Sequence, residues 1–221
     1  MISLALPASS LQVLAVAAHP DDVEIACGGT LLELASSGGL SLTVATLTGT
    51  SEREDEARAA LQAFVPGAVS QFFHLPDGRL PARWEEVKEA LEELAVHVRP
   101  DLVLGPSRQD AHQDHRLLAT LIPTVWRDAL VFEYEIPKWD GDFHPVTTYV
   151  PVSSENAVRK FELLDAHYVS QRGRDWWDRE VFLGIMRLRG MECRTHYAEG
   201  FVVRKATIAR GTNGAPVTVG P

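Results

Sequence analysis

The chain has 221 residues, of which 45% are hydrophobic and 23% charged, and its formal net charge is -9 at pH 7. This length suits one α/β domain with a sizeable core, so we expect a single domain over residues 1–221. The acidic balance, without any basic stripe, argues against a nucleic-acid partner. Cys27 and Cys193 lie far apart without a CxxC spacing, which argues against a disulfide framework or a thiolate zinc site and favours a reducing compartment.

The N-terminal segment "MISLALPASSLQVLAVAA" is apolar and ends in Ala-Val-Ala-Ala, as some secretory signals do. It carries no Lys or Arg before its apolar part, and cleavage after Ala18 would remove the strand that presents His19. We therefore expect a core strand of a cytoplasmic protein. No apolar run predicts a transmembrane span.

Short apolar runs, typical of buried strands, alternate with helical stretches from the N-terminus onward. The predicted strands are 13–18, 42–47, 70–74, 102–104 and 131–134. The predicted helices between them are 27–37, 51–64, 81–98 and 113–128. This alternation predicts right-handed βαβ crossovers and therefore an α/β fold, a Rossmann-like three-layer α/β/α sandwich with a mainly parallel sheet.

After Glu135 the alternation ends. The segment "IPKWDGDFHPVTTYVPVS" is rich in Pro, Asp and Gly, and we assign it no helix or strand. Two helices, 154–166 and 174–187, are predicted next, and the tail "YAEGFVVRKATIAR" indicates a turn followed by a strand. No repeat, low-complexity segment or long linker marks a domain boundary.

Polar clusters follow the first and fourth predicted strands: "HPDD" from His19 and "DAHQDH" from Asp110. In an open parallel sheet, the loops at the carboxyl ends of the strands form the ligand crevice, so we expect both clusters to meet there. Histidines and carboxylates from two loops match a catalytic zinc site, in which three ligands leave a fourth position for water. A cation would also offset the cost of grouping acids at a partly buried edge. His112 and His115 share a helix face without necessarily sharing the metal.

Each cluster also has a simpler interpretation. "HPDD" could form an Asx-type turn that caps the helix predicted near Cys27, and Asp110 could cap the helix that follows it. Both clusters together favour a site over two separate caps. Spacing alone does not choose between Asp21 and Asp22 as metal ligand and catalytic base.

We expect structural roles for most of the remaining glycine, tryptophan and histidine residues. The fingerprints GxGxxG and GxxxxGK[ST] are absent, so we expect Gly28 and Gly29 to allow close helix packing, and a cofactor-binding oxidoreductase is disfavoured. Three tryptophans could stack on a sugar ring, although such side chains pack at least as often: Trp139, Trp176 and Trp177. The remaining histidines are expected to be core or surface residues: His74, His97, His144, His167 and His196.

The motifs resemble those of the LmbE-like, or PIG-L, zinc-dependent N-deacetylases, which act on N-acetylglucosamine-type groups. "AHPDDVEIACGGTL" is similar to the first motif of that family and "HQDH" to its second. "REDEARAAL" from Arg53 resembles its Arg-x-x-Glu helix, and "LPDGRL" from Leu75 its Leu-Pro-Asp-Gly turn. "HYVSQ" and "YAEGF" resemble its C-terminal landmarks. The weakest match is "EIPKWDGDFHP", where the substrate-recognition loops of this family vary.

The resemblance implies roles for individual residues. Asp21 would be the general base, and Arg53 would contact the substrate. His112 would stabilise or protonate the tetrahedral intermediate, oriented by Asp114. Fe²⁺ or Co²⁺ could replace zinc in the same ligand set. The implied zinc ligands are His19, Asp22 and His115.

We therefore expect a zinc-dependent hydrolase that acts on a linear amide bond and removes an acetyl group from an N-acetylated amino sugar or its conjugate. The alternatives are a zinc amidohydrolase acting on a non-sugar amide, such as an intermediate of secondary metabolism, and a non-catalytic sugar-binding module. The sequence leaves open whether the acceptor is a free sugar, nucleotide sugar, glycolipid, thiol conjugate or natural product. It also leaves open the physiological metal, the pathway and the oligomeric state, a homo-oligomer included.

Overall fold

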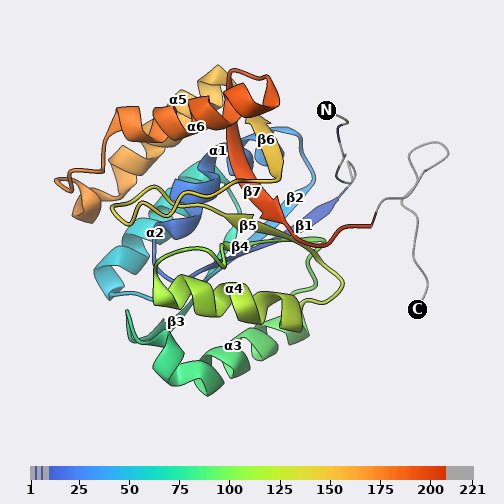
Figure 1. The fold of residues 1–221 in the computed structure, drawn as a ribbon. Coiled ribbons are helices and arrows are strands. Elements are labelled where there is room, and N and C mark those ends of the chain that lie inside the picture. The colour runs from blue at the N-terminus through green and yellow to red at the C-terminus, as the bar shows by residue number, and fades with distance from the viewer. Residues whose placement is uncertain (1–2, 4–5, 7–9, 208–221) are drawn as a thin grey trace.

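The alternation of strands and helices builds one sheet with helices on both faces (Figure 1). The computed structural model describes residues 3, 6 and 10–207. The strands are β1 (Leu11–Ala17), β2 (Leu40–Thr48), β3 (Val69–Leu75), β4 (Leu102–Pro106), β5 (Leu130–Tyr134), β6 (Thr148–Val152) and β7 (Tyr197–Val203). The helices are α1 (Asp22–Ser36), α2 (Ser51–Phe64), α3 (Trp84–His97), α4 (Gln113–Val125), α5 (Ser154–His167) and α6 (Arg179–Cys193), with short 3₁₀ turns η1 (Leu80–Arg83) and η2 (Val169–Gln171).

Within the described residues, the sheet has seven strands in the order β3-β2-β1-β4-β5-β7-β6. Strands β1 to β5 are parallel, and β7 runs antiparallel to both β5 and β6. Helices α1, α2 and α5 contact one another and α6 contacts α5, while α3 contacts α4 on the opposite face of the sheet (Figure 1). The predicted Rossmann-like three-layer sandwich with a mainly parallel sheet is confirmed.

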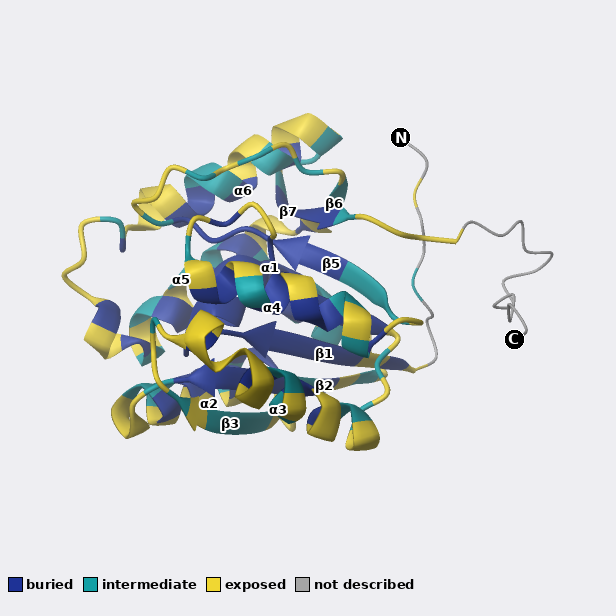
Figure 2. Ribbon diagram, turned by 60° about the horizontal axis from the view of Figure 1, so that its bottom comes forward, coloured by how far each residue is buried: buried dark blue, intermediate teal, exposed yellow. Residues whose placement is uncertain are grey.

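The central strand β1 is buried on both faces, because its alternate side chains enter two separate apolar cores. In Figure 2, β1 is dark blue, while the outer faces of the helices are yellow. Val13, Ala15 and Ala17 pack beneath α1 and α2. Leu14, Val16 and Ala18 pack beneath α3 and α4. The chain that follows β1 therefore places His19 at the carboxyl edge of the sheet, in the buried centre of that edge.

The first helix differs from its prediction, because α1 begins at Asp22 and not near Cys27. Asp21 adopts φ 101°, which turns the chain sharply after β1, and its carbonyl accepts the N–H of Ile25 at 2.9 Å. The interpretation of "HPDD" as a side-chain cap of a later helix is therefore wrong, since Asp21 makes no side-chain cap bond.

Gly28 and Gly29 lie inside α1, where they allow close packing as predicted. A Cβ at Gly28 would lie 2.8 Å from the Phe64 ring, and one at Gly29 would lie 2.9 Å from Val152. Such distances would force the neighbouring side chains to move. The two glycines therefore let α1 approach α2 and β6 closely.

The C-terminal part contains one strand that the sequence pattern did not predict. β6 lies in the Pro-rich segment at the edge of the sheet, where its only partner among the described strands is β7. Helix α6 begins at Arg179 and not at Arg174, because Asp178 caps it by accepting the N–H of Glu180 at 2.6 Å. The tail strand is β7, and residues 208–210 of the predicted tail lie outside the described residues. No helix in the described part of the chain has the length and apolar character needed to cross a membrane.

Candidate metal centre and active site

The two predicted clusters meet at the carboxyl ends of β1 and β4. His115 Nε2 lies 3.2 Å from His19 Nδ1 and 3.2 Å from Asp22 Oδ2. His19 Nδ1 lies 3.5 Å from the same Asp22 oxygen. All three side chains are buried. The structure thus brings two imidazole nitrogens and one carboxylate oxygen together, although His115 and His19 are 96 positions apart in the chain.

This spacing fits a metal ion. In a tetrahedral zinc site with metal–ligand distances of about 2.0–2.2 Å, neighbouring donor atoms are about 3.3–3.6 Å apart. The donor set, two neutral imidazoles and a carboxylate, is also one that zinc prefers. Ligand atoms of two other sets lie within 4.8 Å of one another, namely His19, His112 and His115, and His19, Asp77 and Asp114. We favour the set with Asp22, because its separations of 3.2, 3.2 and 3.5 Å lie within about 0.1 Å of the tetrahedral spacing and its carboxylate contributes negative charge.

Carboxylates occupy the other ring nitrogen of both histidines. His115 Nδ1 is 2.9 Å from Asp110 Oδ2, and His19 Nε2 is 2.9 Å from Asp77 Oδ1. The hydrogen bond to Asp110 fixes the tautomer and orientation of His115, as such bonds do for metal-binding histidines. Asp22 is held in turn, since its Oδ2 accepts the backbone N–H groups of Ala18 and His19 at 3.0 and 2.8 Å. The donor atoms of His115 and Asp22 are therefore preorganised.

The charges of this cluster are strongly coupled. Burial alone would lower the pKa of His19, but Asp22 and Asp114 outweigh it and raise the pKa to about 12. For His115, Asp22 and Asp110 likewise outweigh burial and raise the pKa to about 9. Burial would raise the pKa of Asp22, but the two histidines hold it well below its usual value. The carboxylates around the two histidines therefore favour positive charge at this position, and a bound cation would also supply it.

Asp21 lies beside this cluster in a strained conformation. A positive φ in a residue other than glycine costs about 1–3 kcal/mol and often marks a functional site. Its Oδ2 is 3.0 Å from Arg53 Nη2, and the same nitrogen donates to the Pro20 carbonyl at 2.7 Å. Burial raises the pKa of Asp21 to about 7, although Arg53 acts in the opposite direction. A buried carboxyl that titrates near neutrality has the properties of a general base.

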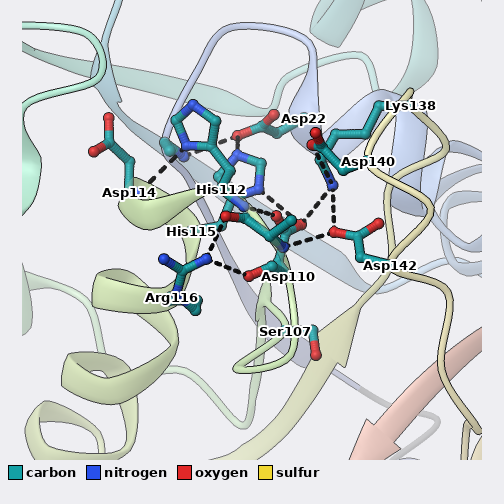
Figure 3. A network of polar contacts seen from close by, with 12 residues as sticks. Asp22, Ser107, Asp110, His112, Asp114, His115, Arg116, Lys138, Asp140 and Asp142 are labelled. Carbon is teal, nitrogen blue, oxygen red and sulfur yellow. Dashed lines mark hydrogen bonds and ion pairs between the residues drawn. The ribbon is translucent and has the colours of Figure 1, made fainter.

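His112 lies against both proposed ligands, with ring centroids 4.7 Å from His19 and 4.9 Å from His115. It forms the N-cap of α4, because its Nδ1 accepts the N–H of Asp114 at 3.3 Å (Figure 3). Burial lowers its pKa, and the neighbouring histidines lower it further. A neutral His112 therefore carries its proton on Nε2.

The carboxylate of Asp114 lies against the "LPDG" turn. Its carboxylate accepts the backbone N–H groups of Gly78 and Leu80 at 2.8 and 3.1 Å. It therefore holds the "LPDG" turn against α4. Asp114 orients His112 through its backbone N–H and not through a carboxylate–imidazole hydrogen bond.

Sequence reasoning gave no role to several residues of this region. Glu24 is buried in the first turn of α1, and burial raises its pKa to about 7. Its position directly after "HPDD" could have indicated burial, since residues next to this buried motif enter the core as well. Lys138 reaches Asp110 at 3.0 Å from the β5–β6 loop (residues 135–147). No pattern indicated this contact, because the loop is the weakest match to the family.

The predicted tryptophans separate in their exposure. Trp177 is buried, as packing predicts, and Trp176 packs against its ring with centroids 5.5 Å apart. Trp139 is 61% exposed, and its indole N–H donates to Asp175. Of the three, Trp139 therefore offers the most surface to a ligand.

Known proteins share the sequence of this chain in part. The profile of the PIG-L family, described as GlcNAc-PI de-N-acetylase, matches residues 14–126. The chain belongs to the PIG-L family. This PIG-L protein is 33% identical over 169 residues to the uncharacterized deacetylase YaiS of Escherichia coli K12, a match that covers 70% of this chain and 89% of YaiS.

Solved structures share the fold of this PIG-L protein. The N,N'-diacetylchitobiose deacetylase of Pyrococcus horikoshii has a TM-score of 0.72 and 20% identity, with 87% of this chain and 83% of that chain covered. The conserved protein TT1542 of Thermus thermophilus has a TM-score of 0.70 and 26% identity, with 90% and 97% covered. The resemblance inferred from the motifs is confirmed, and the protein is a deacetylase of the PIG-L/LmbE type.

Proposed function

We propose that this protein is a metal-dependent hydrolase that removes the acetyl group from an N-acetylated amino sugar or its conjugate. The observation that carries the proposal is the set of three donor atoms from His19, Asp22 and His115, within 3.5 Å of one another and beside Asp21. The description of the family as a GlcNAc-PI de-N-acetylase supports a sugar substrate. A divalent cation bound there, zinc or in its place Fe²⁺ or Co²⁺, would supply a Lewis acid that activates water and polarises the amide carbonyl.

In this proposal, Asp21 takes the proton of the attacking water. Its carboxylate is buried, and its raised pKa suits proton transfer near neutral pH. Arg53 contacts Asp21 Oδ2 at 3.0 Å, which fixes the carboxylate and leaves Oδ1 for the water. Arg53 is thus placed to orient the base, and in this proposal it also contacts the substrate.

His112 donates a hydrogen bond to the oxygen on which negative charge develops. Its Nδ1 is occupied by the Asp114 N–H, so Nε2–H is the donor. This assigns a neutral ring to His112, which agrees with its lowered pKa. When the C–N bond breaks, the proton held by Asp21 passes to the amine. The products are acetate and the free amine.

The test is acetate release from N-acetylated amino sugars and their nucleotide, lipid and thiol conjugates. Asp21→Asn should keep one metal ion per chain and lose kcat by roughly 10²–10⁴-fold, because the donor set is intact and the base is absent. Asp55→Asn, at an exposed position of α2, is the matched control and should retain wild-type kcat. Wild-type kcat in Asp21→Asn would refute the assignment of the base.

The panel also separates the remaining alternatives. Release from sugar conjugates supports the proposed substrate class, and the ranking identifies the acceptor. If the metal is bound but no member releases acetate, the substrate is a non-sugar amide. Sugar binding without turnover in the metal-loaded protein would instead indicate a binding module.

A further inference from the structure

The β5–β6 loop contacts the candidate metal centre through the ammonium group of Lys138. Lys138 Nζ donates to Asp110 Oδ2 at 3.0 Å and to Asp142 Oδ2 at 2.9 Å, and it lies 3.7 Å from Asp140. In Figure 3 the end of the Lys138 side chain lies between the carboxylates of Asp110 and Asp142. The side chains of Lys138 and Asp110 are only 13% and 3% exposed.

The oxygen that Lys138 contacts is the one that holds His115. Asp110 Oδ2 is 2.9 Å from His115 Nδ1, while Oδ1 accepts the backbone N–H of His112 at 2.7 Å. Asp110 therefore needs a fixed position, since it determines the orientation of one proposed ligand and the start of α4. Lys138 is the side chain that holds its Oδ2 from the loop side.

The other end of the bridge holds the same segment by its backbone. Asp142 Oδ2 accepts the N–H of Ala111 at 2.7 Å as well as the Lys138 ammonium. Asp110 and Ala111 are thus both bound by the loop, one through Lys138 and one through Asp142. The loop that matches the family least is consequently tied to the residues just before "HQDH".

We infer that Lys138 is a positioning residue that keeps Asp110, and through it the His115 imidazole, in the geometry that binds the metal. This inference rests on the proposed function, because it concerns the same metal site. Lys138 does not reach the donor atoms and is not a catalytic residue.

The burial of this bridge distinguishes it from an ordinary surface ion pair. Burial alone would lower the pKa of Lys138, but Asp110 and Asp142 outweigh it and raise the pKa, so the ammonium is charged. The Lys88–Glu92 pair on α3, in which the Glu92 side chain is 58% exposed, contributes little, since water screens it and both side chains lose freedom. A partly desolvated lysine shared by two carboxylates has a defined position that such pairs lack.

The experiment compares Lys138→Met, Lys138→Gln, Lys138→Arg and the control Lys88→Met. The dissociation constant for Zn²⁺ is measured by competition with a chromophoric chelator, and thermal unfolding of each metal-free protein is recorded. Loss of a residue that orients a metal ligand typically weakens metal binding by roughly 10–100-fold. We expect a Kd increase near ten-fold for Lys138→Met and Lys138→Gln, because Asp110 itself remains. Lys138→Arg should restore Kd to within about three-fold of wild type, since a guanidinium can also bridge two carboxylates.

Each outcome has a definite meaning. Wild-type Zn²⁺ affinity in the folded Met and Gln variants, or an equal loss in Lys88→Met, overturns the inference. If only one neutral variant folds, that variant decides. Weak metal binding that Arg restores supports a positioning role, because a general loss of stability would not follow the charge at this position. If the wild type binds metal but releases no acetate, the proposed function fails separately, and if it binds no metal, both fall.

Discussion

The buried ion pair between Lys160 of α5 and Glu199 of β7 makes a sharp prediction about stability. Glu199 Oε1 accepts from Lys160 Nζ at 2.6 Å and from the Gly29 N–H at 2.8 Å, and Oε2 accepts from the Thr30 N–H at 2.7 Å. The two charged side chains are 2% and 3% exposed. This carboxylate therefore joins α1, α5 and β7 behind the candidate active site.

Lys160→Met keeps the length of the side chain and removes its charge. The carboxylate of Glu199 then keeps only two backbone N–H groups as its partners in the core. Removing one partner of a buried pair costs about 3–5 kcal/mol of unfolding free energy. We expect the lower half of this range, because the two N–H groups continue to stabilise the carboxylate. For a chain of this size, each kcal/mol corresponds to roughly 2–4 °C, so Tm should fall by roughly 6–16 °C.

The assay is urea unfolding of the metal-free protein followed by far-UV circular dichroism. Lys88→Met removes the charge from a pair on α3 in which the Glu92 side chain is 58% exposed, and it should change stability by less than about 0.5 kcal/mol. The double variant Lys160→Met/Glu199→Gln should recover most of the loss, since no charge then remains in the core. A loss below about 1 kcal/mol in Lys160→Met would refute the reasoning, because an unpaired buried carboxylate must cost more than that.

Three further predictions concern the backbone and a second buried acid. Glu24→Gln should make the metal-free protein more stable at pH 8 but not at pH 4. The reason is that an acid whose pKa rises from 4.5 unfolded to about 7 folded costs stability as the pH rises through that window, up to about 3 kcal/mol above it. Chemical denaturation across this pH range is the measurement, and parallel pH profiles for both proteins would contradict the prediction. Gly190→Ala should lower the free energy of unfolding by about 1–3 kcal/mol, because the new Cβ would lie 2.4 Å from the His196 carbonyl oxygen. Gly184→Ala, on the same helix with nothing within 4 Å, should gain about 0.5–1 kcal/mol in the same assay. Asp21→Gly should be more stable than Asp21→Ala by about 1 kcal/mol or more in thermal unfolding, since only glycine adopts φ 101° without strain. Equal Tm values for these two variants would show that Asp21 is not strained.

Helix α2 is the element whose predicted bounds, 51–64, agree with the structure at both ends. Helix α2 begins and ends where the pattern placed it, because Thr50 caps it by accepting the Arg53 N–H and Pro66 follows its C-terminus. The start of α1 was misplaced, since a left-handed Asp21 has no sequence signal that distinguishes it from a turn. Strand β6 was missed because it is a short edge strand that contains Pro151, and its register depends on β7.

The site shows the same division between local and distant causes. The meeting of "HPDD" and "HQDH" could be predicted, because parallel strands deliver both motifs to one edge. The Asp114 carboxylate accepts a hydrogen bond from Gly78 in the "LPDG" turn, and these two residues are 36 positions apart in the chain. Neither motif alone could predict this hydrogen bond. Lys138 is 28 positions from Asp110, in a loop without periodicity, so only the folded chain places it at the site.

The structure places several unfavourable features in the few residues that join β1 to α1. Asp21 is strained and buried, and Asp22 and Glu24 bring two more carboxyl groups into the core. The strained backbone of Asp21 and the buried carboxyl group of Glu24 both cost stability, which agrees with a segment shaped for function. The middle of α1 is held by its neighbours. Gly28 and Gly29 allow close packing there, and Glu199 accepts the backbone N–H groups of Gly29 and Thr30. Firm attachment of the middle of α1 is what allows its first turn to keep a geometry that this segment would not adopt alone.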